Sequence, residues 1–158
     1  MIQRIQTLYL LLASVFFFCY WFFGLKWYQF GFRILQDNFS HDFFINSPIP
    51  ELILNITSII PLLIAIICVI SIFIFKYRNK QILICKISLY LSMFMSLYTL
   101  FYFYFALEGL VSIMPSKILE ILMYLAIVNP FVCSYLIYLA VKSISNDSEL
   151  VESLNRIR

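Results

Sequence analysis

The sequence predicts an all-α membrane protein in which four transmembrane helices form a bundle. Three observations predict this fold: long apolar segments, few charged residues, and basic residues gathered in alternate connecting segments. Hydrophobic residues make up 63% of the chain and charged residues 12%, against roughly 45–50% and 25% in soluble domains. A chain of 158 residues has too little interior to bury four helices that are apolar on every side. We therefore expect these segments to face lipid, where a single span must be helical to satisfy its backbone hydrogen bonds.

Each apolar segment lacks Asp, Glu, Lys, Arg and His and has the length of a membrane span. A helix needs roughly 20 apolar residues to cross a hydrocarbon core about 30 Å thick. The predicted spans, within one integral membrane domain covering residues 1–158, are residues 5–25, 52–75, 87–107 and 121–141. The first is longer than the apolar part of a signal peptide, which has roughly 7–15 residues, and no cleavage site of small residues follows it. We expect it to be retained as a span.

The charges of the connecting segments predict the orientation of the spans. Eight of the 11 basic residues lie on one side: Arg4, Lys76, Arg78, Lys80, Lys86, Lys142, Arg156 and Arg158. Because cytoplasmic segments are enriched in Lys and Arg, both termini, the loop at 76–86 and the tail at 142–158 are predicted to be cytoplasmic. The first outer loop is then 26–51. The basic loop could also attract anionic lipid headgroups, but we interpret it as a determinant of topology.

The second and fourth spans share a pattern of proline and asparagine. Each has a proline, Pro61 or Pro130, ten residues after a flanking glutamate, and an asparagine, Asn55 or Asn129, in its outer half. Proline removes a backbone hydrogen bond and kinks a helix, and a nearby polar side chain can satisfy the freed carbonyl. These four residues are candidate kink and polar positions. The first and third spans share no such pattern, so we interpret the similarity as chance rather than duplication.

Small polar residues recur on the third span at helical spacing. They are Ser88, Ser92, Ser96 and Thr99. Steps of three and four residues place them on one face, where small side chains allow helices to approach closely. We favour helix packing over a polar track for a substrate.

Two segments outside the spans are candidates for docking a partner. Apolar residues at every second position from 28 to 34 predict a short strand, which the aromatic segment at 39–45 would pair with. This loop is interpreted as a lid at the membrane interface, with a docking surface as the alternative. In the tail, apolar residues at helical spacing predict a short amphipathic helix beneath the inner leaflet or against a partner. The candidate docking residues are Trp27, Phe30, Phe32, Phe43, Phe44, Leu150, Leu154 and Ile157.

The chain offers no catalytic, cofactor-binding or metal-binding set. It contains three Gly and one His, too few for a phosphate-binding loop, a zinc motif or a Ser-His-Asp triad. The four Cys are isolated, and we interpret them as ordinary buried thiols. The few basic residues flank the spans, so nucleic acid is not expected as a partner. No enzymatic activity is expected, and spans without ionisable residues argue against a proton-coupled pump.

Both ends of the chain resemble a known family. The start, MIQRIQTLYLLLA, and the end, LVESLNRIR, are similar to those of a family of small four-span membrane proteins from the Bacteroidota, described as a domain of unknown function. Leu154 and Asn155 depart from the small residue and aspartate usual in that family. The resemblance implies a protein of the bacterial inner membrane without an assigned reaction.

We therefore predict an accessory or scaffold subunit of a membrane complex, in contact with the lipid bilayer and with a protein partner or a second copy of the chain. The alternative is a small transporter or lipid-handling protein that uses a cavity beside the kinked second and fourth helices.

Overall fold

The computed structural model describes residues 2–38, 49–113 and 116–156, and side chains over most of these ranges. The helices in these ranges are α1 (Ile2–Asn38), α3 (Ile49–Phe73), α4 (Arg78–Ile113) and α5 (Lys117–Arg156). All four are long and apolar enough to cross a membrane, and the described residues contain no strand. The all-α fold class is confirmed, and it indicates a multi-pass membrane protein.

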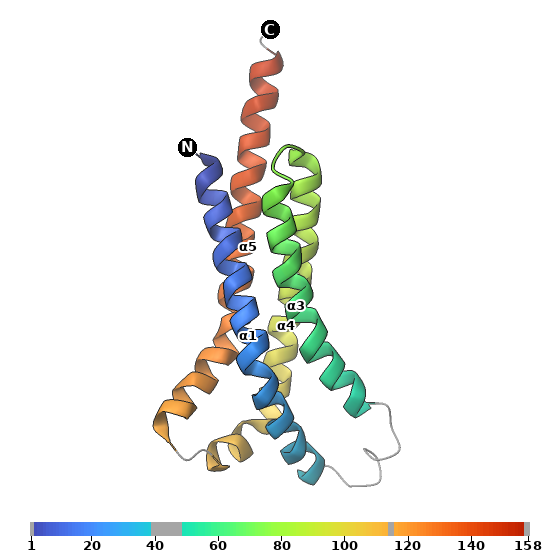
Figure 1. The fold of residues 1–158 in the computed structure, drawn as a ribbon, viewed down its shortest axis with the longest axis vertical. Coiled ribbons are helices and arrows are strands. Elements are labelled where there is room, and N and C mark those ends of the chain that lie inside the picture. Colours follow the sequence, from blue (N-terminus) through green and yellow to red (C-terminus); the bar gives the residue numbers. More distant parts are fainter. Residues whose placement is uncertain (1, 39–48, 114–115, 157–158) are drawn as a thin grey trace.

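The helices form an elongated bundle in which both chain ends lie at the same end of the molecule (Figure 1). The turn that joins α3 to α4 lies at this end as well. Helix α1 contacts α3, α4 and α5, and α4 contacts α3 and α5. Because α1 and α4 meet across the centre, α3 and α5 occupy opposite corners. At the far end of the molecule α3 and α5 diverge from one another.

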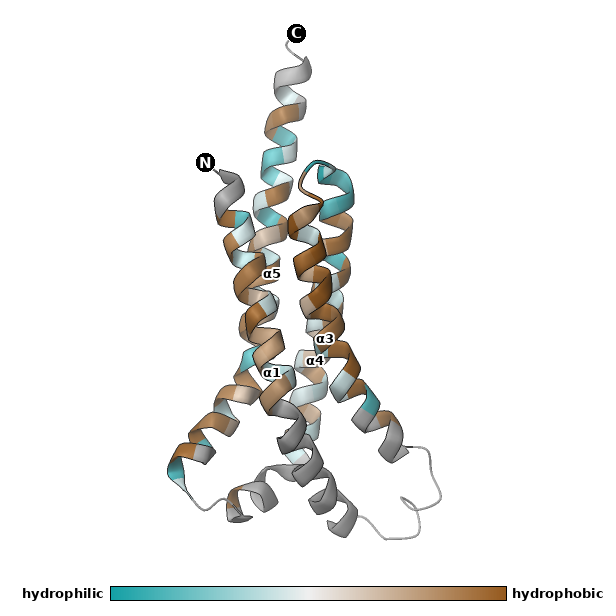
Figure 2. Ribbon diagram, in the orientation of Figure 1, coloured by the Kyte–Doolittle hydropathy of each residue, from teal (hydrophilic) through white to brown (hydrophobic). Residues whose placement is uncertain are grey.

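The bundle buries small and polar side chains together with an apolar core, and many large apolar side chains are exposed on its outside. On α4, Ser88, Ser92 and Thr99 are fully buried, whereas Leu97 and Phe101 are each 68% exposed. A soluble protein would show the reverse distribution. In lipid, the apolar surface needs no cover, and small buried residues allow close helix packing. Apolar residues form the middle of the bundle, with polar residues concentrated toward the end that carries the termini (Figure 2). This distribution indicates contact with a lipid bilayer.

Hydroxyl groups of the buried stripe on α4 bond to the backbone of their own helix. Ser88, Ser92, Ser96 and Thr99 donate to the carbonyl oxygens of Cys85, Leu89, Ser92 and Met95 at 2.8, 2.8, 2.9 and 2.7 Å, respectively. No buried side-chain nitrogen or oxygen in the described part of the chain lacks a hydrogen-bond partner. The stripe is buried in the bundle with its hydroxyls satisfied, as a packing surface requires.

The strand predicted at residues 28–34 is wrong, because α1 continues without a break to Asn38. Alternation over so few residues does not exclude a helix that is apolar on several sides, and no proline interrupts this segment. Extending the helix keeps its backbone groups bonded, whereas a lone strand leaves them unpaired. The segment at 39–45, predicted to pair with this strand, lies outside the described residues.

Two other connections also differ from the sequence-based expectation. The predicted loop at 76–86 is mostly helical, because α4 begins at Arg78, and a turn at 74–77 joins it to α3. The tail is helical as expected, but it forms no separate helix beneath the leaflet. It continues α5 as far as Arg156 and projects beyond the bundle (Figure 1), because no glycine or proline follows Pro130 to end the helix.

Candidate functional site: a cavity at the end of the bundle

The candidate kink positions lie in two different environments. Pro61 and Pro130 are both buried within their helices, and α3 and α5 occupy opposite corners of the bundle. Asn129 lies between α5 and α1, where its Nδ2 donates to the carbonyl oxygen of Phe16 at 3.2 Å. Asn55 is exposed on α3. The similar sequence pattern therefore does not produce a similar site.

Most of the candidate docking residues lie where the structure gives only a backbone or no description. Trp27, Phe30 and Phe32 belong to the helical backbone of α1, and Leu154 to that of α5. Leu150 is 57% exposed on the projecting part of α5. The remaining candidates, which lie outside the described residues, are Phe43, Phe44 and Ile157.

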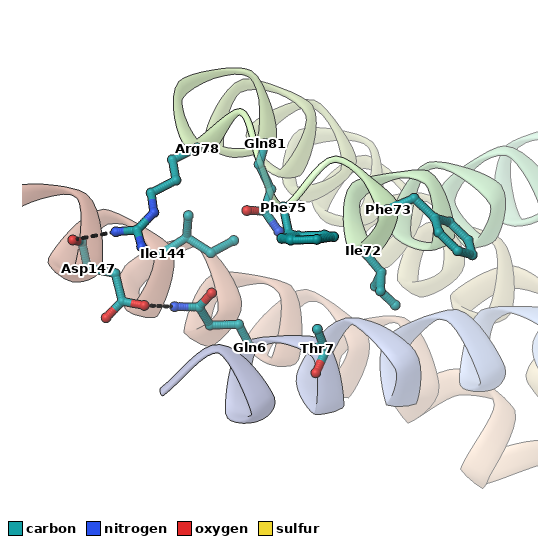
Figure 3. Close-up of a pocket in the computed structure, with 9 residues that line it drawn as sticks. All are labelled: Gln6, Thr7, Ile72, Phe73, Phe75, Arg78, Gln81, Ile144 and Asp147. Carbon is teal, nitrogen blue, oxygen red and sulfur yellow. Dashed lines mark hydrogen bonds between the residues drawn. The ribbon is translucent and has the colours of Figure 1, made fainter. Parts of the chain in front are cut away.

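A cavity of about 360 Å³ lies among the helices at the end that carries the termini (Figure 3). Its polar lining residues are Gln6, Thr7, Arg78, Gln81 and Asp147. Its apolar lining residues are Ile72, Phe73, Phe75 and Ile144. All four helices and the turn between α3 and α4 contribute to the lining. The cavity therefore exists only when the whole bundle is assembled.

Asp147 connects three helices at this cavity. Its carboxylate Oδ2 accepts a hydrogen bond from Nε2 of Gln6 on α1. Its main-chain carbonyl oxygen accepts a second bond, at 2.8 Å, from Nη1 of Arg78 at the start of α4. On the opposite wall, Nε2 of Gln81 donates to the carbonyl oxygen of Ser71 at 3.1 Å and so joins α4 to α3. These bonds hold the polar side chains in place around the cavity (Figure 3).

The cavity carries one cation and one anion whose charged groups each hydrogen-bond to another group. Arg78 contacts the main chain of Asp147, and the carboxylate of Asp147 is bonded to the neutral amide of Gln6. Both Gln6 and Gln81 are buried, with 5% and 3% of their surface exposed. Buried amides are usually retained where each donor and acceptor has a partner. The arrangement therefore places a positive and a negative group in the lining of one cavity.

Sequence reasoning did not find this cavity, although one signal was present. Gln6 is the one amide in the first predicted span, and Asp147 is the first acidic residue after the fourth. Nothing in the linear sequence, however, shows that the two residues meet.

The comparisons with known proteins give a family but no assigned activity. The family model described as Domain of unknown function (DUF4293) matches residues 2–157. The chain belongs to this family. The match extends through all four helices and confirms that the chain belongs to a family described as a domain of unknown function. No curated protein and no solved structure matches the chain.

The described residues contain no group of His, Cys, Asp and Glu side chains that could hold a metal ion. The four cysteines are free thiols: Cys68, Cys85 and Cys133 are buried as expected, whereas Cys19 is exposed. Cys133 donates to Oδ1 of Asn129 at 3.0 Å. This thiol therefore supports the asparagine that joins α5 to α1.

Replacing Asn129 by alanine is expected to weaken the packing of α5 against α1. Asn129→Ala removes the bond to the Phe16 carbonyl and should lower the free energy of unfolding by about 0.6–1.7 kcal/mol, the range for hydrogen bonds between membrane helices. Equilibrium unfolding of the purified protein in detergent micelles measures this loss.

The matched control is Asn55→Ala, which replaces the same residue type at an exposed position and should change the free energy of unfolding by less than about 0.5 kcal/mol. Equal losses for the two variants would contradict the role assigned to Asn129.

Proposed function

We propose that this protein is a non-enzymatic accessory or scaffold subunit of a complex in the bacterial inner membrane. The observation that carries the proposal is the length of α5, which extends to Arg156 and projects beyond the other helices (Figure 1). On this projection Leu150 and Val151 are 57% and 41% exposed. A single projecting helix gains little stability on its own, and a partner that covers these apolar side chains would stabilise it. The projection is therefore the proposed docking arm.

The polar residues inside the bundle support a packing role over a transport role. Tyr20 Oη and Thr99 Oγ1 lie 3.0 Å apart and join α1 to α4. Ser96 Oγ and Ser134 Oγ lie 3.2 Å apart and join α4 to α5. A transport route beside the kinked helices would need polar groups that face a passage. Here these two pairs of hydroxyls bond from helix to helix, and the buried hydroxyls of α4 also bond to their own backbone, so these groups serve helix packing.

The distribution of charge supports a cytoplasmic location for both termini. The turn that contains Lys76 lies at the same end of the bundle as the N-terminus and the projection of α5 (Figure 1). Arg78 and Lys80 follow directly at the start of α4. A concentration of basic residues near span ends favours the cytoplasmic side. The docking arm would then meet its partner at the inner face of the membrane.

The orientation can be tested with two single cysteines at exposed positions. Asn79→Cys lies at the basic end of the bundle and Ser116→Cys lies at the opposite end. In spheroplasts, a membrane-impermeant maleimide should label Ser116→Cys directly and Asn79→Cys only after lysis. The unsubstituted chain, treated in the same way, gives the background labelling of the native cysteines. The reverse labelling order would contradict the proposed orientation.

The docking arm can be tested by photocrosslinking in native membranes. A photoreactive amino acid at position 150 should give a discrete adduct with another protein, because this position is exposed beyond the bundle. The control position is Leu97, which is 68% exposed well inside the candidate span Arg78–Tyr104 and should contact lipid, whereas Leu150 lies one residue before the end of the candidate span Glu120–Val151. Absence of an adduct at 150, together with purification of the chain alone or with only its own copies, would contradict the scaffold proposal. An identical adduct at both positions would contradict the assignment to the arm.

A further inference from the structure

The cavity lies at the level where the candidate membrane spans end. Gln6 is near the start of the first span, Phe73 is the last residue of the second, and Arg78 is the first residue of the third. The exposed residues Lys76 and Lys80 lie in and just after the connecting turn. Charged and amide side chains at this depth meet lipid headgroups rather than acyl chains. The polar lining therefore faces the headgroup region.

One wall of the cavity is continuous with the surface that contacts lipid. Phe73 and Phe75 line the cavity, and they are also 76% and 51% exposed. Ile144, on the opposite side of the cavity, is buried. A ligand with acyl chains can leave these chains along the two phenylalanines while its headgroup enters among the polar residues. A fully water-soluble ligand would make no use of such a wall.

The two charged lining residues have complementary binding capacity. A guanidinium has five N–H donors, and the bond to the Asp147 carbonyl uses one nitrogen of Arg78. Guanidinium groups bind phosphate oxygens well because their donors are arranged as a planar fork. The carboxylate of Asp147 accepts from Gln6 through Oδ2, and carboxylates accept several bonds, including those from a primary ammonium group. No ion pair joins Arg78 to Asp147 among the described contacts.

We propose that the cavity binds the headgroup of a phospholipid that carries both a phosphate and a primary ammonium group, as in phosphatidylethanolamine. Arg78 binds the phosphate and Asp147 binds the ammonium. The buried amide of Gln6 holds Asp147 in place on one wall of the cavity, and that of Gln81 joins α4 to α3 on the opposite wall. A volume of about 360 Å³ lies within the roughly 300–1,000 Å³ of small-ligand pockets. This lipid site is independent of the docking arm.

The charges also predict which lipids the cavity rejects. Phosphatidylglycerol offers the same phosphate to Arg78, but its neutral glycerol group leaves Asp147 without a cationic partner. Phosphatidylcholine has a cation, but its trimethylammonium group has no N–H to donate to the carboxylate. Specificity of this kind comes from the cost of an unpaired polar group. Phosphatidylethanolamine should therefore be favoured over both.

Native mass spectrometry of the full chain, released from nanodiscs of equimolar phosphatidylethanolamine and phosphatidylglycerol, tests the proposal. The unsubstituted protein should retain phosphatidylethanolamine in preference to phosphatidylglycerol. Arg78→Gln should lower the fraction of protein that retains a lipid by about tenfold, as expected when a charged hydrogen bond is lost. The matched control is Lys80→Gln, whose lysine lies over the Tyr77 ring at 5.2 Å and not in the cavity lining. It should retain lipid as the unsubstituted chain does.

Asp147→Asn gives a second readout that does not depend on Arg78→Gln folding well. The substitution removes the negative charge but keeps the carbonyl that accepts from Arg78. It should shift the retained lipid from phosphatidylethanolamine toward phosphatidylglycerol. An unchanged preference would overturn the proposal, as would equal losses in Arg78→Gln and Lys80→Gln. A competition experiment with soluble phosphoethanolamine separates the two sources of this headgroup. If phosphoethanolamine displaces the lipid at equal concentration, the site serves a soluble ligand and the lipid assignment fails.

Discussion

The lack of water in the hydrocarbon core is the constraint on which the rest of this structure depends. Every polar group within a span must find its hydrogen-bond partner inside the chain. The hydroxyls on α4 meet this requirement by bonding to carbonyls of their own helix. Because these side chains are small, neighbouring helices come close enough for hydroxyl-to-hydroxyl contacts such as that of Ser96 with Ser134. Many large apolar residues can then lie on the outside of the bundle, where they contact lipid.

The same constraint separates the middle of the bundle from its ends. Within the spans, polar side chains form hydrogen bonds inside the bundle. Asn129, for example, bonds to the backbone of α1. At the end that carries both termini, charged residues are tolerated because headgroups and water are near. Arg78 and Asp147 can therefore remain unpaired with each other and line a cavity. Recognition by this protein is accordingly expected at the ends of its helices: a lipid in the cavity and a protein on the projecting part of α5.

What the sequence predicted correctly depends on local patterns. The spans were predicted from long segments without charged residues. The buried face of α4 was predicted from small polar residues spaced three and four positions apart, which any helix places on one side. The strand at 28–34 and the separate tail helix were wrong for one reason: a helix continues until a residue ends it, and neither segment begins with such a residue. The cavity could not be predicted, because Gln6 and Asp147 are 141 positions apart in sequence. The different environments of Asn55 and Asn129 depend on which face of each helix turns inward, which the shared Asn and Pro residues do not specify.

The central claim is that small polar residues hold α4 and α5 in direct contact, and disulfide trapping in native membranes tests it most directly. The pair Ser96→Cys with Ser134→Cys replaces two hydroxyls that lie 3.2 Å apart, within reach of a disulfide. The control pair, Leu97→Cys with Tyr135→Cys, lies one position further along each helix, where the side chains are 68% and 62% exposed. After mild oxidation and proteolysis, mass spectrometry should detect the linked peptides for the first pair and not for the control. Linkage of the control pair alone, or equal linkage of both, would contradict this packing.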